Sequence, residues 1–249
     1  MARKHANKET TADHMIEEFE SAADRLAGWV SDHAMAVGAT VVLSLVAAGG
    51  YSGWNSWHSG RERSASNALD AVTSAYLSAM GAAPGALELP ELANPEAAKR
   101  ISAEYAERFQ TVQDEHAGTV AAALAGLERG NLMAAEGDRE SSLQIWRAAV
   151  ADTPGNSSLR AILLERIAQA QEEAGQWAEA AQTHEQAGEI AAFPLRYWSL
   201  AAAARCYATA GEPQRALALF QRVETEATGL QLPVDARLQL RELRAAAAS

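Results

Sequence analysis

Histidine and cysteine, the residues most suited to metal binding and nucleophilic chemistry, are few in this 249-residue chain and do not cluster. The six histidines are scattered: His5, His14, His33, His58, His116 and His184. None has a second His or Cys at a spacing that would place both on one helix face, as a helix-borne zinc site requires. His184-Glu185 begins like a zincin motif but lacks the second histidine, so we expect His184 in the core. We predict no metal and no cofactor.

Nucleophilic and acid–base chemistry has no better support. The sequence contains no glycine-rich phosphate loop and no nucleophile elbow. Asp114-Glu115 and Glu172-Glu173 are adjacent acidic pairs, and adjacent residues on a helix do not face each other. The single cysteine, Cys206, follows an alanine-rich stretch, which predicts a buried and inert thiol. The sequence therefore predicts a protein that is not an enzyme and has no small-molecule substrate.

The composition favours helices throughout the chain. Alanine, which loses no side-chain entropy in a helix, is by far the commonest residue, whereas aromatic residues make up only 6%. A β protein would need many more β-branched and aromatic residues. The predicted fold class is all-α. The net charge of −11 argues against a nucleic-acid partner, because nucleic-acid binding requires a clustered basic surface.

One segment near the N-terminus has the length and polarity of a transmembrane helix. The stretch between Asp32 and Arg61 carries no formal charge, and aromatic residues stand near its end: Tyr51, Trp54 and Trp57. Its apolar part is roughly 31 Å long as a helix, which matches the hydrocarbon thickness of a bilayer. Aromatic residues are typical of the membrane interface. We predict one transmembrane helix at 33–57.

The preceding tail, residues 1–32, is unlike a cleavable signal peptide. It carries four basic and seven acidic residues, whereas a signal peptide begins with a positive region. Apolar residues at helical spacing from Asp13 onward predict a short amphipathic helix, which either docks on a surface or is simply solvated. The basic residues near the span are too few and too even to decide its orientation.

The predicted span also carries small residues on one side. They recur at a spacing that lets two membrane helices approach closely: Ala36, Thr40, Ser44, Ala48, Gly49 and Gly53. An alanine-rich chain also produces such a ridge by chance, so both interpretations remain open.

The C-terminal part of the chain repeats one layout three times. A helix is followed by a turn with glycine and then by a second helix, and the turn glycines Gly137, Gly175 and Gly211 recur at nearly even spacing. This resembles the tetratricopeptide repeat, whose period of about 34 residues is slightly shorter. The resemblance implies an α-solenoid at 96–249. In the residues before it, 58–95, the apolar spacing predicts a juxtamembrane helix, and glycines and prolines predict a loop after it. The segment around Phe109 resembles the second helix of a degenerate earlier repeat.

Each repeat carries small residues where its two helices are expected to cross. A small residue in the second helix stands four positions before a large one, as in Ser142 and Trp146. The resemblance places four alanines at such crossings: Ala168, Ala180, Ala204 and Ala216. In the tetratricopeptide family the first helices line a concave face. The resemblance therefore implies a net acidic groove for a protein partner, with Trp198 as an aromatic anchor. The residues expected to line this groove are Glu128, Asn131, Glu165, Arg166, Gln169, Glu172, Glu173, Trp198 and Arg205.

The order of these parts is similar to one family in particular. The chain resembles the YfgM-like ancillary subunit of the bacterial SecYEG translocon in the order of three parts. These are an acidic tail, a span that ends in Tyr51-Ser52-Gly53-Trp54, and divergent tetratricopeptide-like pairs. The resemblance implies an inner-membrane protein with a cytoplasmic N-terminus and a periplasmic repeat domain. Its partners would be translocon subunits or periplasmic chaperones, and its function would be to link the two. The alternative is a structural accessory subunit that braces another inner-membrane complex.

Overall fold

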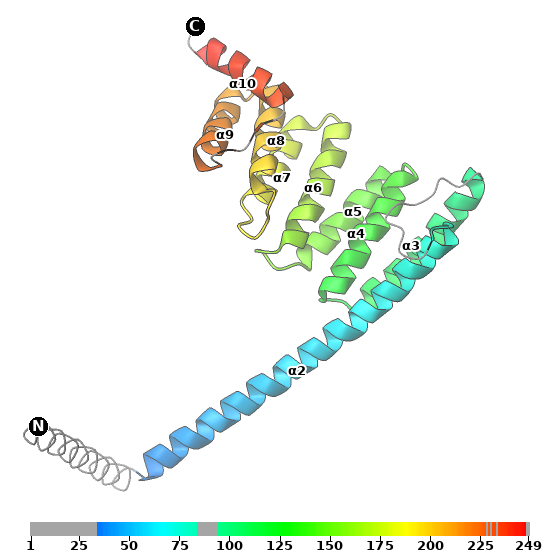
Figure 1. Ribbon diagram of the computed structural model, residues 1–249, viewed down its shortest axis with the longest axis vertical. Coiled ribbons are helices and arrows are strands. Elements are labelled where there is room, and N and C mark those ends of the chain that lie inside the picture. Colours follow the sequence, from blue (N-terminus) through cyan, green and yellow to red (C-terminus); the bar gives the residue numbers. More distant parts are fainter. Residues whose placement is uncertain (1–33, 84–93, 228, 230, 233, 248–249) are drawn as a thin grey trace, which may run out of the picture. The chain divides into compact units, whose positions relative to one another are not determined.

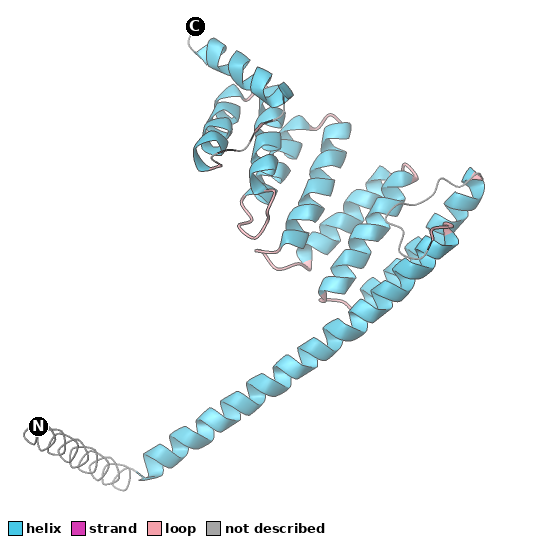
Figure 2. Cartoon of the chain, viewed as in Figure 1, coloured by secondary structure: helices cyan, strands magenta, loops and turns pink. Residues whose placement is uncertain are grey.

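The computed structural model describes residues 34–83, 94–227, 229, 231–232 and 234–247, with side chains from residue 56 onward except 235, 246 and 247. Within these ranges the secondary structure is helical, without a strand (Figure 2). The predicted all-α class is therefore confirmed for the described part of the chain. Its helices are α2 (Ala34–Ala79), α3 (Pro95–Glu115), α4 (Val120–Ala135), α5 (Arg139–Ala151), α6 (Ser158–Glu173), α7 (Trp177–Gly188), α8 (Arg196–Thr209), α9 (Pro213–Glu226) and α10 (Val234–Ala247).

The chain divides into two compact units, Met1–Ser59 and Gly60–Ser249. In the first unit the structure describes chiefly the backbone of the beginning of α2. Among the residues that the structure describes, no helix combines the length and the apolar character needed to cross a membrane. The tail at 1–32 and the small-residue ridge from Ala36 to Gly53 lie outside the residues whose side chains are described, as does most of the predicted span at 33–57.

Within its described residues, the second unit is built from four successive helix pairs (Figure 1). Pair 1 joins residues 60–79 of α2 to α3, and its core includes Tyr76, Tyr105 and Phe109. The ring centroids of Tyr76 and Tyr105 are 5.4 Å apart. Pairs 2, 3 and 4 are α4 with α5, α6 with α7, and α8 with α9, and each pair also packs against the next. Helix α10 packs on α8 and α9 and closes the C-terminal end of the core.

The turns inside pairs 2, 3 and 4 share one geometry that requires glycine. The residues Gly137, Gly175 and Gly211 have φ values of +85°, +73° and +82°, a left-handed conformation that disfavours other residues. In each turn the glycine N–H donates to the carbonyl three residues back. The N–H of the next residue donates to the carbonyl five residues back, as from Gln176 to Gln171 at 2.9 Å. This is the Schellman motif that ends many helices.

The registers of pairs 2, 3 and 4 are therefore fixed relative to their turn glycines. The first helices of these pairs begin at equal intervals, at Val120, Ser158 and Arg196. The turns inside the pairs are short, whereas the loops between the pairs are longer. The loops at 152–157 and 189–195 accommodate the residues beyond the usual tetratricopeptide period of about 34 residues.

Small and large side chains alternate across each pair. Nine residues after the turn glycine stands a large buried side chain: Trp146, His184 or Phe220. Seven residues before the turn glycine stands a small residue of the first helix: Gly130, Ala168 or Ala204. A Cβ atom added to Gly130 would lie 2.1 Å from Nε1 of Trp146, so the largest side chain of the set is matched to the residue without one. The alanines expected at the crossings, Ala168, Ala180, Ala204 and Ala216, are all fully buried.

Overpacking one crossing tests this register. In α9, Ala216 is fully buried whereas Ala218 is exposed, so the two residues form a matched pair on one helix. We expect Ala216→Leu to lower the free energy of unfolding by about 1–3 kcal/mol, because the added methyl groups have no space between α8 and α9. Ala218→Leu should change it little. Urea denaturation of both variants measures the difference, and equal stabilities would contradict the register.

Candidate binding site

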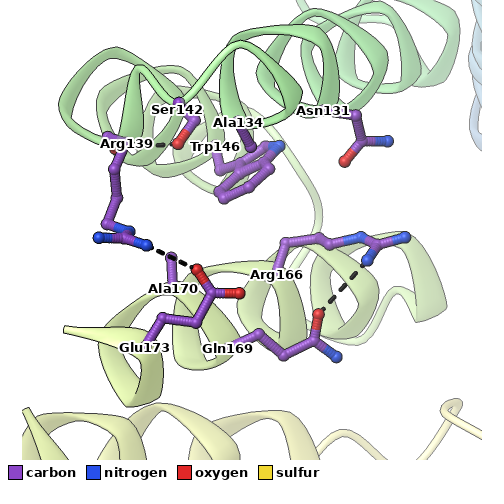
Figure 3. A pocket seen from close by; sticks show the side chains of 10 residues that line it. Asn131, Ala134, Arg139, Ser142, Trp146, Arg166, Gln169, Ala170 and Glu173 are labelled. Carbon is purple, nitrogen blue, oxygen red and sulfur yellow. Dashed lines mark hydrogen bonds and ion pairs between the residues drawn. The ribbon is translucent and has the colours of Figure 1, made fainter. Parts of the chain in front are cut away.

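A cavity of about 370 Å³ opens where pair 2 meets pair 3. Its walls come from α4, α5 and α6, as Figure 3 shows, and its lining is Asn131, Ala134, Gly137, Arg139, Ser142, Trp146, Arg166, Gln169, Ala170 and Glu173. We call it the inter-pair cavity. Its size and mixed polarity suit one or two side chains of a polypeptide rather than a large cofactor.

Charged groups of both signs stand on opposite walls of the inter-pair cavity. Nη2 of Arg139 in α5 lies 2.9 Å from Oε2 of Glu173 in α6. Arg166 donates from Nη1 to Oε1 of Gln169 over 3.3 Å, a neutral amide (Figure 3). Trp146 is buried between the helices, and its indole N–H donates to the carbonyl of Leu127 at 3.2 Å. The cavity thus combines an aromatic wall with guanidinium, carboxylate and amide groups.

The inter-pair cavity contains four of the nine residues predicted for the groove: Asn131, Arg166, Gln169 and Glu173. Sequence reasoning missed Arg139, Ser142 and Trp146, because it took the lining from first helices alone and these residues belong to the second helix of pair 2. One signal in the sequence could have identified Arg139. It stands two residues after the turn glycine Gly137, so it begins the second helix close to the end of the first helix, whose residues were expected to line the groove.

Two other predicted groove residues lie away from this cavity's lining. Glu128 is exposed on α4 and accepts a hydrogen bond from Asn131 over 3.4 Å. Trp198 is 40% exposed near the start of α8, seven residues before Arg205. Two helical turns separate Trp198 from Arg205, so both side chains leave α8 on the same side. An exposed tryptophan of this kind is a typical anchor for a protein partner.

The remaining three predicted residues, Glu165, Glu172 and Arg205, form an ionic cluster around His184. The imidazole of His184 is only 2% exposed. Its Nδ1 lies 3.0 Å from Oε1 of Glu165 and its Nε2 lies 2.7 Å from Oε1 of Glu172. Arg205 of the next pair donates to both oxygens of Glu172, at 2.7 and 2.6 Å. Because both ring nitrogens face carboxylates, the geometry fits a doubly protonated imidazolium.

The pKa values of the cluster follow from these contacts. Burial alone would lower the pKa of His184, but hydrogen bonds to Glu165 and Glu172 and their negative charges raise it to about 9. Burial alone would raise the pKa of Glu172, but the hydrogen bonds and charges of His184 and Arg205 lower it to about 2. At neutral pH Glu172 is therefore a carboxylate and His184 an imidazolium.

Cys206 lies beside this cluster and is fully buried. Burial and the neighbouring Glu172 raise the pKa of its thiol to about 12, in agreement with the inert thiol expected from the sequence. Even so, one possible ligand atom each of Glu172, His184 and Cys206 lies within 4.8 Å of the others. These residues come from three helices, so their spacing in the sequence gave no sign that they meet.

The cluster predicts how stability depends on pH. The folded pKa of His184, about 9, exceeds its ordinary value of 6.5, so its contribution is present below pH 6.5 and is lost as the pH rises through 9. The folded pKa of Glu172, about 2, is below its ordinary value of 4.5, so its contribution is present above pH 4.5 and is lost as the pH falls towards 2. Between pH 6.5 and 9.5 the His184 contribution, on the order of 3 kcal/mol, should disappear from the free energy of unfolding.

Replacement of His184 isolates this effect. Phe220 occupies the same register position in pair 4, so His184→Phe fits the packing of the repeat. Urea denaturation at several pH values should show the loss between pH 6.5 and 9.5 in the wild type and a much smaller one in the variant. If the free energy of unfolding changed equally with pH in both proteins, His184 would not be held as a cation.

Comparison with known proteins agrees with this architecture. A family model described as the tetratricopeptide repeat-like domain matches residues 28–201, which is more than half of the chain. Two crystal structures from Podosopora anserina, of a protein assigned as a kinesin light chain with nearly identical TPR-like repeats and of a variant of it, are similar. Each is 21% identical, covers 60% of this chain and 80% of its own, and has a TM-score of 0.47. No curated protein matches. From the extent of the family match, the chain belongs to the tetratricopeptide repeat-like domain family.

Proposed function

We propose that this protein is a membrane-anchored, non-enzymatic module that binds a polypeptide on the face formed by its inter-pair cavity and Trp198. Tetratricopeptide-like repeats suggest protein–protein interaction, and the observation that carries the proposal is the cavity between pairs 2 and 3. Stacked helix pairs bury their apolar faces against one another and leave an extended surface between them for a partner.

The chemistry of the cavity walls favours a peptide segment with both charged and apolar groups. Asn131 and Gln169 offer amides that can both donate to and accept from a peptide backbone. Arg166, whose hydrogen bond goes to a neutral amide, offers planar donors to an acidic group, and Glu173 offers acceptors to a basic one. The exposed Trp198 offers apolar area at low cost in conformational entropy, while the buried Trp146 forms part of the cavity wall.

The finer part of the proposal is the location and the partner. We place residues 33–57 in the bacterial inner membrane, residues 1–32 in the cytoplasm and the repeats in the periplasm. The partners would be SecYEG translocon subunits or periplasmic chaperones. The uncharged stretch with its aromatic end and the resemblance to the YfgM-like translocon subunit support this assignment. An anchor would raise the effective concentration of the groove beside its partner, so that a weak interaction suffices.

Crosslinking from the groove tests the proposed binding. A photoreactive amino acid at position 166 or 198 in intact membranes should crosslink to translocon subunits or to chaperones. The same residue at position 221, exposed on the second helix α9, should not, which makes Gln221 the matched control. A probe on the small-residue side of the predicted span, at position 44, tests the alternative: crosslinks from there to another stoichiometric membrane complex, with none from 166 or 198, would support the bracing subunit instead.

Substitutions should distinguish residues that contribute to partner binding from residues that do not. We expect Trp198→Ala and Arg166→Glu each to weaken partner binding about tenfold or more, because aromatic and arginine residues dominate such interfaces. Gln221→Ala should have no measurable effect. Pull-down in mild detergent at several partner concentrations gives the affinities, and equal affinities for all three variants would exclude this face.

The topology has its own test. A reporter that is active only in the periplasm, fused after Ser249, should be active, because residues 61–249 lie beyond the proposed span. A reporter active only in the cytoplasm serves as the matched control at the same position. If the cytoplasmic reporter alone is active, the proposed orientation is wrong.

A further inference from the structure

We propose that Glu172, His184 and Cys206 form a binding site for a zinc ion at the boundary between pair 3 and pair 4. The three side chains come from α6, α7 and α8, and one ligand atom from each lies within 4.8 Å of the other two. Imidazole nitrogen, thiolate sulfur and carboxylate oxygen together are a ligand set that suits Zn²⁺. A water molecule would complete the tetrahedron.

The ligand atoms would have to shift by about an ångström to bind zinc. Ligand atoms on tetrahedral zinc are roughly 3.5 Å apart, from metal–ligand distances of about 2.0–2.3 Å. Nε2 of His184 and Oε1 of Glu172 are already 2.7 Å apart, so an inserted ion would push them slightly outward while drawing in the sulfur of Cys206.

The groups around the ligands resemble the surroundings of known metal sites. A metal-bound histidine usually donates its other ring N–H to a carboxylate, which fixes the tautomer. Here Glu165 stands 3.0 Å from Nδ1 of His184 and supplies that carboxylate. The side chains of Glu165 and Glu172 are 22% and 18% exposed, so the cluster has access to solvent on one side whereas the imidazole and the thiol are buried.

An ion in this place is also compatible with the charge balance of the cluster. Without metal, imidazolium and Arg205 balance the carboxylates of Glu165 and Glu172, and Cys206 is a neutral thiol. When Zn²⁺ binds, one proton leaves Nε2 of His184 and one leaves the sulfur of Cys206, and bonds from zinc to nitrogen, sulfur and oxygen form. Two positive charges replace two protons, so the net charge of the cluster is unchanged and Arg205 keeps its carboxylate partner.

Comparison of the repeats within the chain shows that the fold does not need this cluster. At the position of His184, pairs 2 and 4 have Trp146 and Phe220. The other three positions, counted from the turn glycines, are also apolar in the neighbouring pairs: Leu127 and Ala201 for Glu165, Ala134 and Ala208 for Glu172, and Leu132 and Ala170 for Cys206. Buried charges cost free energy in desolvation that apolar residues avoid. Of these three pairs, pair 3 with its junction to pair 4 alone carries the ligand set.

Cobalt(II) tests the site, because a cobalt–thiolate bond gives a charge-transfer band in the near ultraviolet. The full chain in mild-detergent micelles, freed of any affinity tag, is titrated with Co²⁺. Cys206 is the one cysteine in the sequence, so such a band reports this site alone. We expect a band that saturates at one equivalent and that Zn²⁺ abolishes by displacing cobalt. A folded protein without the band would overturn the proposal.

Variants distinguish the site from adventitious binding. Cys206→Ser and His184→Phe should abolish the band, and Glu165→Leu, which copies Leu127 of pair 2, should weaken Co²⁺ binding about 10–100-fold. His116→Ala, at the end of α3 and outside the cluster, is the matched control and should bind as the wild type does. Circular dichroism verifies that each variant is folded. A band that persists in His184→Phe would show that the thiol binds cobalt without the proposed site.

Discussion

The match in volume between the two helices of each pair is the constraint on which the rest of the second unit depends. A helix pair can close only if the first helix offers a small residue where the second offers a large one. Gly130 opposite Trp146 is the extreme case, since any added carbon would collide with the indole. The turn glycines set the register that brings these positions together, and their left-handed backbone leaves little freedom to change it. The cavity and the ionic cluster both take their places from this register.

The cluster in pair 3 shows how such a frame can hold a chemically different interior. His184 stands where its counterparts are aromatic, and it remains buried because carboxylates on the neighbouring helix accept from both of its nitrogens. Glu172 is in turn satisfied by Arg205 of the next pair. A buried ion pair adds little net stability compared with apolar packing, whereas removal of one partner leaves an uncompensated charge. The arrangement therefore acts as a unit, and its members cannot be exchanged singly without cost.

The extent to which the sequence predicts this structure depends on how local each feature is. The turn glycines and the crossing alanines recur at regular spacings, so the helical repeat architecture could be predicted from them. Phe109 in addition indicated the second helix of an earlier, degenerate repeat. The predicted groove residues could not be divided from sequence into those that line the cavity and those that surround His184. That division depends on which side chains of successive helices meet. Arg139 reaches the cavity from a second helix, and Cys206 approaches His184 from the first helix of the following pair.

The two junctions on either side of pair 3 differ in a way that bears on how force passes through the array. The junction with pair 4 is crossed by the partly buried bond of Arg205 to Glu172 and by more extensive packing between α7 and α8. The junction with pair 2 contains the inter-pair cavity, is packed less extensively between α5 and α6, and is crossed by the exposed ion pair of Arg139 and Glu173. In a linear array, where each unit is stabilised chiefly by its neighbours, tension separates the chain first at the junction with the fewest interactions. Pairs 3 and 4 would then stay together as one block while pair 2 parts from them. A peptide seated in the cavity would bridge that weakest junction and make the repeats resist extension as a single body.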